Sequence, residues 1–256
     1  LIMNIAILIS GLPRFTREFQ DFLENIQNYD RIDWFFLLWD TPPSQDLRIP
    51  PSWPYSSPEH TKERIEKHLP ERSNIKHLEI AHQPVFNINK PFIKTEWSVI
   101  PNILTMYYGI EKIFNIQEQC SKDYGEYDLI IRARPDVGID TPLDMRDAKS
   151  FLDSHDSTIL MPRNHRFGLR GFAVNDLFAI GKPSEMKVYS SVFSCQDTYI
   201  AQQVPFHGET LLAHHLLTNN INVPITNFQS VFRCYTNNGE TAWTDDSLTN
   251  FGYWNS

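Results

Sequence analysis

The sequence predicts an α/β protein whose mostly parallel sheet is flanked by helices. Three short apolar runs, at residues 5–9, 34–39 and 129–131, have the continuous hydrophobic character of strands that are buried on both faces. Helical patterns separate them, including a long amphipathic segment at about 98–119. A further short strand is expected at 76–81, so the elements alternate as βαβαβαβ, the order typical of a parallel sheet between helices.

The composition is that of an ordinary globular domain. Hydrophobic residues make up 41% of the 256 positions and charged residues 21%, and we expect a single domain. The net charge of -8 argues against a nucleic-acid partner held by a general basic field, although a local group of arginines can still bind phosphate. No apolar stretch is long enough to cross a membrane. The three cysteines are widely spaced and read as reduced thiols, which favours a cytoplasmic location and no zinc site.

A tight turn follows the first predicted strand, residues 4–10. Gly11, Pro13 and Arg14 form this turn, and a helix with apolar residues at helical spacing follows over about 15–26. The positive end of such a helix and its backbone N–H groups favour phosphate. Gly11, Pro13 and Arg14 are therefore candidate ligand-binding residues, although the turn matches neither GxxxxGK nor GxGxxG.

The second apolar run ends in Asp40. A carboxylate at this place is a candidate for binding a base or ribose, and an equal alternative is that Asp40 caps the turn before Pro42 and Pro43. Residues 41–58 contain six prolines and no periodicity, which predicts a long ordered loop. A helix with a charged outer face is expected to follow and to end near residue 69.

The third run, residues 129–131, is followed directly by charged side chains. Arg132, Arg134 and Asp136 lie within five positions, at the carboxyl end of a central strand, where open α/β sheets bind ligands. The two arginines suit a diphosphate, and Asp136 suits a divalent cation or a sugar hydroxyl. The alternative is a surface turn in which Arg134 and Asp136 merely pair.

The second half of the chain is less regular. We expect a helix near 146–153, a strand at 158–161, a strand at 175–183 with Asp176 at its start, a helix at 210–218, a strand at 221–225 and a tail strand pair within 231–254. The loop at 163–171 is either a plain surface loop or a lid over a diphosphate. Its candidate binding residues are Arg163, His165, Arg166 and Arg170.

Glu209 lies in the first turn of the helix expected at 210–218. The helix dipole alone favours a carboxylate there, so its presence has a purely structural explanation as well as a catalytic one. His207 lies two positions before it, and adjacent His214 and His215 point in different directions on a helix, which argues against a zinc site.

Together these segments resemble the GT-A fold of nucleotide-sugar glycosyltransferases. The family pattern at the end of its fourth strand is an apolar run, often an arginine, and then Asp-x-Asp. In this chain Arg134 stands at the first Asp and Asp136 at the last. Four other segments look like features of the polysaccharide-building members found in bacteria and large viruses: residues 10–14, 39–40, 175–178 and 207–209.

The resemblance implies one GT-A-like domain over 1–256, with a donor-binding half at about 3–140 and an acceptor and lid half at about 141–256. It implies a nucleoside diphosphate sugar donor, with a UDP-sugar favoured, and a glycan acceptor. In the family both acids help to hold Mn²⁺ or Mg²⁺ on the donor diphosphate, so Asp136 is the implied metal or sugar ligand. Arg134 at the first position implies that guanidinium charge replaces part of the work of the metal.

Sugar transfer with inversion, the favoured form, needs a base for the acceptor proton and positive charge beside the departing diphosphate. Glu209, or failing that Asp176, is the expected base. Arg132, Arg134 and Arg14 are the expected clamp on the leaving group, and the resemblance adds His207 to the binding residues.

Two alternatives stay open. A non-catalytic module that binds glycan or nucleotide on the same fold is the main one, since a fold does not imply activity. A nucleotidyltransferase is the other, but its first loop would be rich in glycine and contain lysine, and residues 10–15 contain no lysine.

Overall fold

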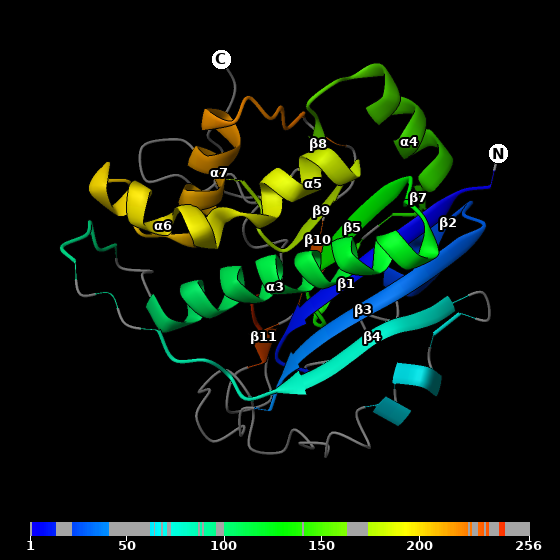
Figure 1. Cartoon of the computed structure of the whole chain (residues 1–256), viewed down its shortest axis with the longest axis horizontal. Helices are drawn as coiled ribbons and strands as arrows, with labels where there is room; N and C mark the ends of the chain where they lie inside the picture. Colours follow the sequence, from blue (N-terminus) through cyan, green and yellow to red (C-terminus); the bar gives the residue numbers. More distant parts are fainter. Residues whose placement is uncertain are drawn as a thin grey trace.

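The structure is a computed structural model (Figure 1). It describes residues 2–13, 22–40, 62–63, 65–67, 69–70, 73–86, 88, 90–95, 100–139, 141–162, 174–224, 226, 230–232, 234–235 and 241–243.

A six-stranded sheet forms the centre of the molecule, in the order β4-β3-β1-β5-β9-β8. Its first four strands are parallel, β9 runs antiparallel to β5, and β8 runs antiparallel to β9. This confirms the predicted α/β class with a mostly parallel, mixed sheet flanked by helices. The strands are β1 (Asn4–Gly11), β3 (Arg31–Trp39), β4 (Ser73–Ala81), β5 (Leu129–Ala133), β8 (Ile159–Leu160) and β9 (Phe178–Gly181).

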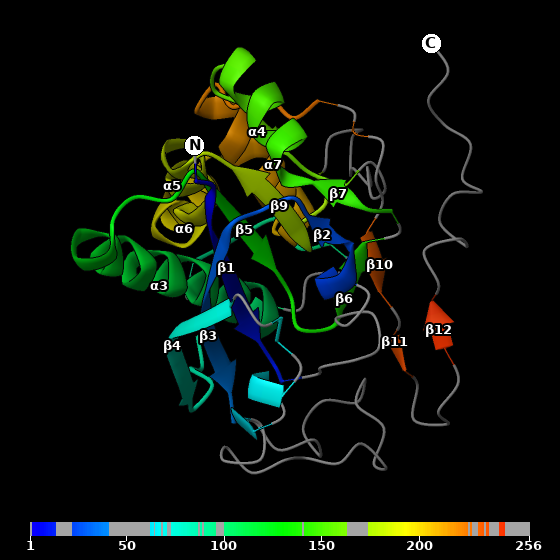
Figure 2. The ribbon, with the colours of Figure 1, turned by 90° about the vertical axis from the view of Figure 1, so that its right-hand side faces the viewer.

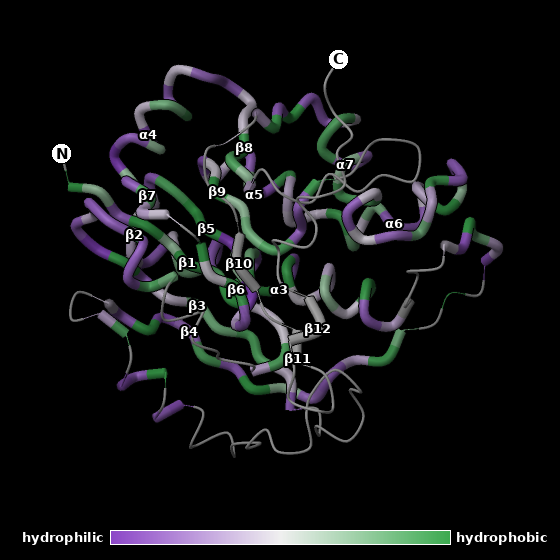
Figure 3. The backbone as a smooth tube through the Cα atoms, turned by 180° about the vertical axis from the view of Figure 1, so that it is seen from behind, coloured by the Kyte–Doolittle hydropathy of each residue, from purple (hydrophilic) through white to green (hydrophobic). Residues whose placement is uncertain are grey.

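Both faces of the sheet are covered, which explains why its central strands are continuously apolar. Ile5, Ile7 and Ile9 of β1 point into one hydrophobic core, and Ala6 and Leu8 point into the other. Much of β1 and β5 is accordingly coloured hydrophobic in Figure 3. Alternate residues of one strand therefore serve two separate cores.

Four helices contribute to the core that contains Leu8: α3 (Ile100–Tyr124), α5 (Pro183–Ser190), α6 (Val192–Ala201) and α7 (Gly208–Thr218). Helix α4 (Met145–Ser154) packs into the opposite core through Met145, Ala148 and Leu152. Its N-cap Asp144 accepts hydrogen bonds from the backbone N–H groups of Arg146 and Asp147, at 2.8 and 3.1 Å. Seen from the side, α3 and α6 lie on one side of the sheet, and β6 and β10 lie on the other (Figure 2).

Three small strand pairs complete the described structure. Strand β2 (Ile26–Gln27) runs parallel to β7 (Leu143–Asp144), β6 (Val137–Ile139) runs antiparallel to β10 (Ser230–Phe232), and β11 (Cys234–Tyr235) runs antiparallel to β12 (Thr241–Trp243). Because β10 pairs with β6, the tail returns to the segment that follows Asp136.

Several expected boundaries were wrong. Strand β5 continues through Arg132 and Ala133, because the sheet pairs both residues with β9. The helix after β1 ends before Ile26, which belongs to a short strand, and the expected strand at 221–225 is reduced to one bridge between Thr158 and Asn222. Helices α5 and α6 were not expected. The loop at 41–58 lies outside the described residues.

Among the described residues, none of the helices combines the length and the apolar character that a membrane crossing requires.

Candidate functional site

The order of the strands changes direction beside β1. The chain leaves β1 to form β3 and β4 on one side, and then crosses through α3 to place β5 on the other side. In open α/β sheets, ligands bind outside the carboxyl ends of the strands at such a switch point. The candidate site is therefore the carboxyl edge of the sheet, where β1, β3, β4 and β5 end.

The turns after β1 and β5 lie against each other at this edge. Gly11 has a φ of +137°, a conformation that side chains disfavour. A Cβ atom built on Gly11 would lie 3.7 Å from Cδ of Pro135. The glycine thus allows the chain to turn close to the segment that carries Arg134 and Asp136.

Arg134 and Asp136 form a bidentate ion pair within one turn. The backbone N–H of Val137 donates to the carbonyl of Arg134 at 3.3 Å, and Pro135 occupies the second position, which its fixed φ favours. Arg134 Nε lies 2.9 Å from Asp136 Oδ1, and Nη2 lies 2.6 Å from Oδ2. The Asp136 side chain is only 5% exposed. The pairing considered as an alternative is therefore present, but at the switch point and in a largely buried position.

Arg132 is not at the surface of the crevice. It is 1% exposed, and its Nη1 donates a hydrogen bond to the backbone carbonyl of Asp176. Its neighbours in the strand, Ile131 and Ala133, point into the core that contains α4. The Arg132 side chain therefore points to the opposite face of the sheet, toward Tyr107 of α3 and Tyr189 of α5. In this structure the side chain supports the backbone of the Asp176 segment, and its role as a diphosphate clamp stays a prediction.

Asp176 is held at the start of β9, on the same edge. Asn175 Oδ1 accepts a hydrogen bond from the backbone N–H of Leu177 at 2.8 Å, which fixes the turn. Asp176 is 8% exposed, and a Cβ atom on Gly208 would lie 3.0 Å from its Oδ2. Gly208 therefore lets the carboxylate approach the first turn of α7, where the helix dipole stabilises negative charge.

Glu209 and His207 form an ion pair beside this carboxylate. His207 Nε2 lies 3.0 Å from Glu209 Oε2, and the Glu209 side chain is 27% exposed. Burial lowers the pKa of His207, but Glu209 and the nearby Asp176 outweigh burial and raise the pKa above its ordinary value. The two candidate bases, Asp176 before β9 and Glu209 in α7, therefore both lie near His207.

Two tyrosines of this site were not expected from the sequence. Tyr107 donates a hydrogen bond to the carbonyl of Gly208 at 2.7 Å, and burial raises its pKa well above the ordinary value. Tyr189 lies next to Arg132, and burial raises its pKa to about 12. Both lie on the apolar faces of helices, where the sequence pattern predicts only core residues. The one indication of a polar contact is that the hydroxyl group of a buried tyrosine usually finds a hydrogen-bond partner.

Asp40 lies at the end of β3 but is tied to the neighbouring strand. Its backbone N–H donates to the carbonyl of Ala81 at 2.9 Å, and Oδ1 lies 3.1 Å from His82 Nδ1. Its role in ligand binding stays a prediction. Pro13 is described at the end of the first turn. The remaining candidate binding residues lie outside the described residues: Arg14, Arg163, His165, Arg166 and Arg170.

The candidate metal ligand Asp136 is paired with an arginine and not with a second acid. Both oxygens of Asp136 accept hydrogen bonds from Arg134. Within the part of the chain that the structure describes, no three His, Cys, Asp or Glu side chains form a group that could hold a metal ion. Arg134 supplies fixed positive charge at this end of β5.

Comparison with models of known protein families gave no match, and comparison with curated protein sequences gave none either.

Proposed function

We propose that the chain has a GT-A-type fold and is a glycosyltransferase that moves a sugar from a nucleoside diphosphate donor to a hydroxyl group of a glycan. The observation that carries the proposal is the arrangement of charge at the carboxyl edge. The Arg134–Asp136 pair lies at the end of β5, and Asp176 lies just before β9, the next strand in the sheet. Glu209 lies in the first turn of α7, which Asp176 approaches at Gly208.

The donor diphosphate would lie over the turns after β1 and β5. The pair with Asp136 fixes the direction of the Arg134 guanidinium before a ligand arrives, and fixed positive charge stabilises the diphosphate as it leaves. A Cβ atom built on Gly11 would be in van der Waals contact with Pro135 of the same segment. In this arrangement the positive charge beside the diphosphate comes from the protein itself.

The acceptor hydroxyl would approach from the side of α7. Its oxygen forms a bond to the anomeric carbon, the bond from that carbon to the diphosphate oxygen breaks, and the acceptor proton passes to Glu209. Glu209 is the more exposed of the two candidate bases, whereas Asp176 is nearly buried. Glu209 is therefore the favoured base, and Asp176 the second choice.

One observation favours a binding module without catalysis. Both carboxylate oxygens of Asp136 accept hydrogen bonds from Arg134, so Asp136 does not offer them to a metal ion as the acids of an Asp-x-Asp motif do. Such a module would bind a nucleotide or a glycan at the same edge without turning over a donor.

A panel of nucleoside diphosphates, followed by thermal unfolding with and without Mn²⁺, tests the proposal. A ligand at 100 times its Kd stabilises the native state by about 2.7 kcal/mol, which corresponds to roughly 5–10 °C for a chain of this size. We expect such a shift with a uridine or guanosine diphosphate and no requirement for Mn²⁺.

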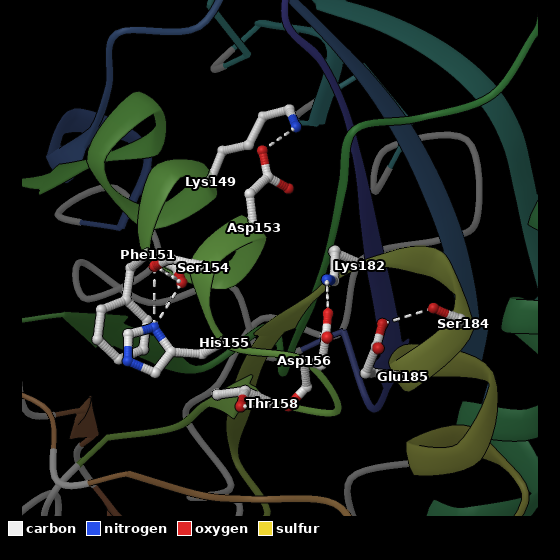
Figure 4. Close-up of polar contacts among 10 residues, drawn as sticks. All are labelled: Lys149, Phe151, Asp153, Ser154, His155, Asp156, Thr158, Lys182, Ser184 and Glu185. Atoms are coloured by element: carbon white, nitrogen blue, oxygen red, sulfur yellow. Dashed lines mark hydrogen bonds and ion pairs between the residues drawn. The ribbon is translucent and has the colours of Figure 1, made fainter.

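The matched control removes a different cation. Lys149 of α4 pairs with Asp153 at 2.6 Å (Figure 4), and neither residue belongs to the candidate site. Lys149→Ala should keep the full shift, and Arg134→Ala should lose most of it. The absence of a shift with every nucleotide at millimolar concentration would contradict the proposal.

A further inference from the structure

His207 has both ring nitrogens bound to side chains of its own helix. It occupies the N-cap position of α7 with an extended backbone, and its side chain makes no capping hydrogen bond to the backbone. Nε2 lies 3.0 Å from Glu209 Oε2, and Nδ1 lies 3.0 Å from Thr210 Oγ1. The imidazole therefore bridges two residues, and neither nitrogen points at the crevice as a free base.

Thr210 allows this bridge to persist when His207 changes its protonation state. An imidazolium donates from both nitrogens, so Thr210 Oγ1 accepts from Nδ1. A neutral imidazole with its proton on Nε2 still donates to Glu209, and the threonine hydroxyl then donates to Nδ1. The direction of the Glu209 carboxylate is thus the same in both states, and only the charge beside it changes.

The other charged and titratable groups of the site come from β5, α3, α5 and the segment before β9. Asp176, before β9, adds negative charge next to His207, and Arg132 of β5 donates a hydrogen bond to the backbone carbonyl of Asp176. Tyr107 of α3 and Tyr189 of α5 stay neutral at ordinary pH, because burial raises the pKa of both. Among the groups near His207, Glu209 makes the direct contact.

We propose that His207 is a positioning residue that directs the Glu209 carboxylate toward the acceptor and sets its basicity through the charge of the imidazole. The inference rests on the proposed function. When the acceptor proton passes to Glu209, the proton of His207 Nε2 stays on the ring, and Glu209 returns the acquired proton to water after the product leaves. No electron transfer or additional reactant is needed.

The ion pair is tested first without any substrate. The nine histidines are followed by NMR during a pH titration, and the signal missing from His207→Gln identifies His207. In Glu209→Gln the carboxylate charge is removed, so we expect the His207 titration to move to lower pH. The signal of His155, just after α4, serves as the reference; its ring stacks on Phe151 (Figure 4), with the two ring centroids 4.1 Å apart.

The catalytic consequence is tested with two variants of His207. Glutamine keeps an N–H donor but does not titrate, so His207→Gln should keep kcat within a few-fold. Phenylalanine has no donor, so His207→Phe should lower kcat by roughly 10- to 100-fold, the cost of a misplaced catalytic group, while the KM for the donor changes little. His155→Gln serves as the control for loss of a histidine.

The pH profile separates positioning from a general loss of structure. In the wild type, kcat should rise as His207 loses its proton, because Glu209 becomes a stronger base without the neighbouring positive charge. This rise should be absent from His207→Gln. An unchanged kcat in a folded His207→Phe, or the same rise in His207→Gln, would overturn the positioning role.

Failure of this inference and failure of the proposed function give different results. If the wild type turns over no donor but the His207 titration shifts in Glu209→Gln, the pair exists and the proposed function is wrong. If the titration does not move in Glu209→Gln, the inference is wrong whatever the activity of the wild type.

Discussion

Arg134 holds both carboxylate oxygens of Asp136, through Nε at 2.9 Å and Nη2 at 2.6 Å, at the carboxyl end of the central strand β5. A bidentate pair of this kind has a fixed geometry as well as opposite charges. The carboxylate is almost completely buried and the guanidinium is 22% exposed, so the cationic partner is the one nearer to a ligand. This pair distinguishes the chain from a site in which two acids bind a metal.

Arg134→Lys tests whether the geometry of the pair matters beyond its charge. A lysine keeps one positive charge but cannot form the two parallel hydrogen bonds. We expect nucleoside diphosphate affinity to fall in Arg134→Lys and to fall further in Arg134→Ala, as measured by calorimetry. If both variants bind nucleoside diphosphates as tightly as the wild type, Arg134 does not take part in ligand binding.

Tyr127→Phe tests a polar cluster at the opposite edge of the sheet. The fully buried Asp33 accepts hydrogen bonds from Tyr127 Oη at 2.9 Å, Arg31 Nε at 2.9 Å and Asn74 Nδ2 at 3.2 Å. Removing one donor from a buried carboxylate should lower the free energy of unfolding by about 1–3 kcal/mol, measured by urea denaturation. Nucleotide binding should not change.

Tyr124→Phe is the matched control for that experiment. Tyr124 is 54% exposed, and its ring lies under Lys76 with Nζ 4.0 Å from the centroid, a contact that phenylalanine keeps. Its effect should stay within about 0.5 kcal/mol. Equal effects of the two substitutions would mean that the Asp33 cluster adds no stability.

The burial of His215 should make the free energy of unfolding depend on pH. Its Nε2 lies 2.6 Å from the carbonyl of Val188, Nδ1 accepts from the hydroxyl of Tyr199, and burial lowers its pKa. The unfolded chain therefore takes up a proton at about pH 6.5, where the folded chain does not. The contribution of His215 is complete above that pH and is lost as the pH falls below it.

Urea denaturation between pH 8 and pH 5 measures this dependence. The slope below pH 6.5 should be smaller in His215→Gln than in the wild type, by at most about 1.4 kcal/mol per pH unit for one proton. His207 is present in both proteins, so its opposite contribution cancels in the comparison. Identical slopes would show that His215 titrates alike in the folded and unfolded chains.

The sheet could be predicted because its signal is local. Ile7 and Trp34 lie in continuous apolar runs that only a strand covered on both faces explains, and the runs were assigned to strands correctly. The antiparallel pairing of β9 with β5 depends on residues about 50 positions apart, and no pattern within either strand indicates it.

The site was predicted less completely for the same reason. Arg132 has the sequence context of a residue at a strand end, but strand β5 continues past it, and the alternation of faces turns its side chain into the core. The contacts of Tyr107 with Gly208 and of Asp176 with α7 join segments that are far apart in sequence. Composition and periodicity do not report such contacts.

Nucleotide release by the wild type and Glu209→Gln, measured on one set of nucleotide sugars with glycan acceptors, tests the central claim most directly. Glutamine keeps the size and hydrogen bonding of Glu209 but cannot take the acceptor proton. We expect transfer to fall by roughly two to four orders of magnitude, with donor affinity nearly unchanged. Equal turnover in both proteins would move the base to Asp176, and no turnover by the wild type with any donor would contradict the assignment of this chain as a glycosyltransferase.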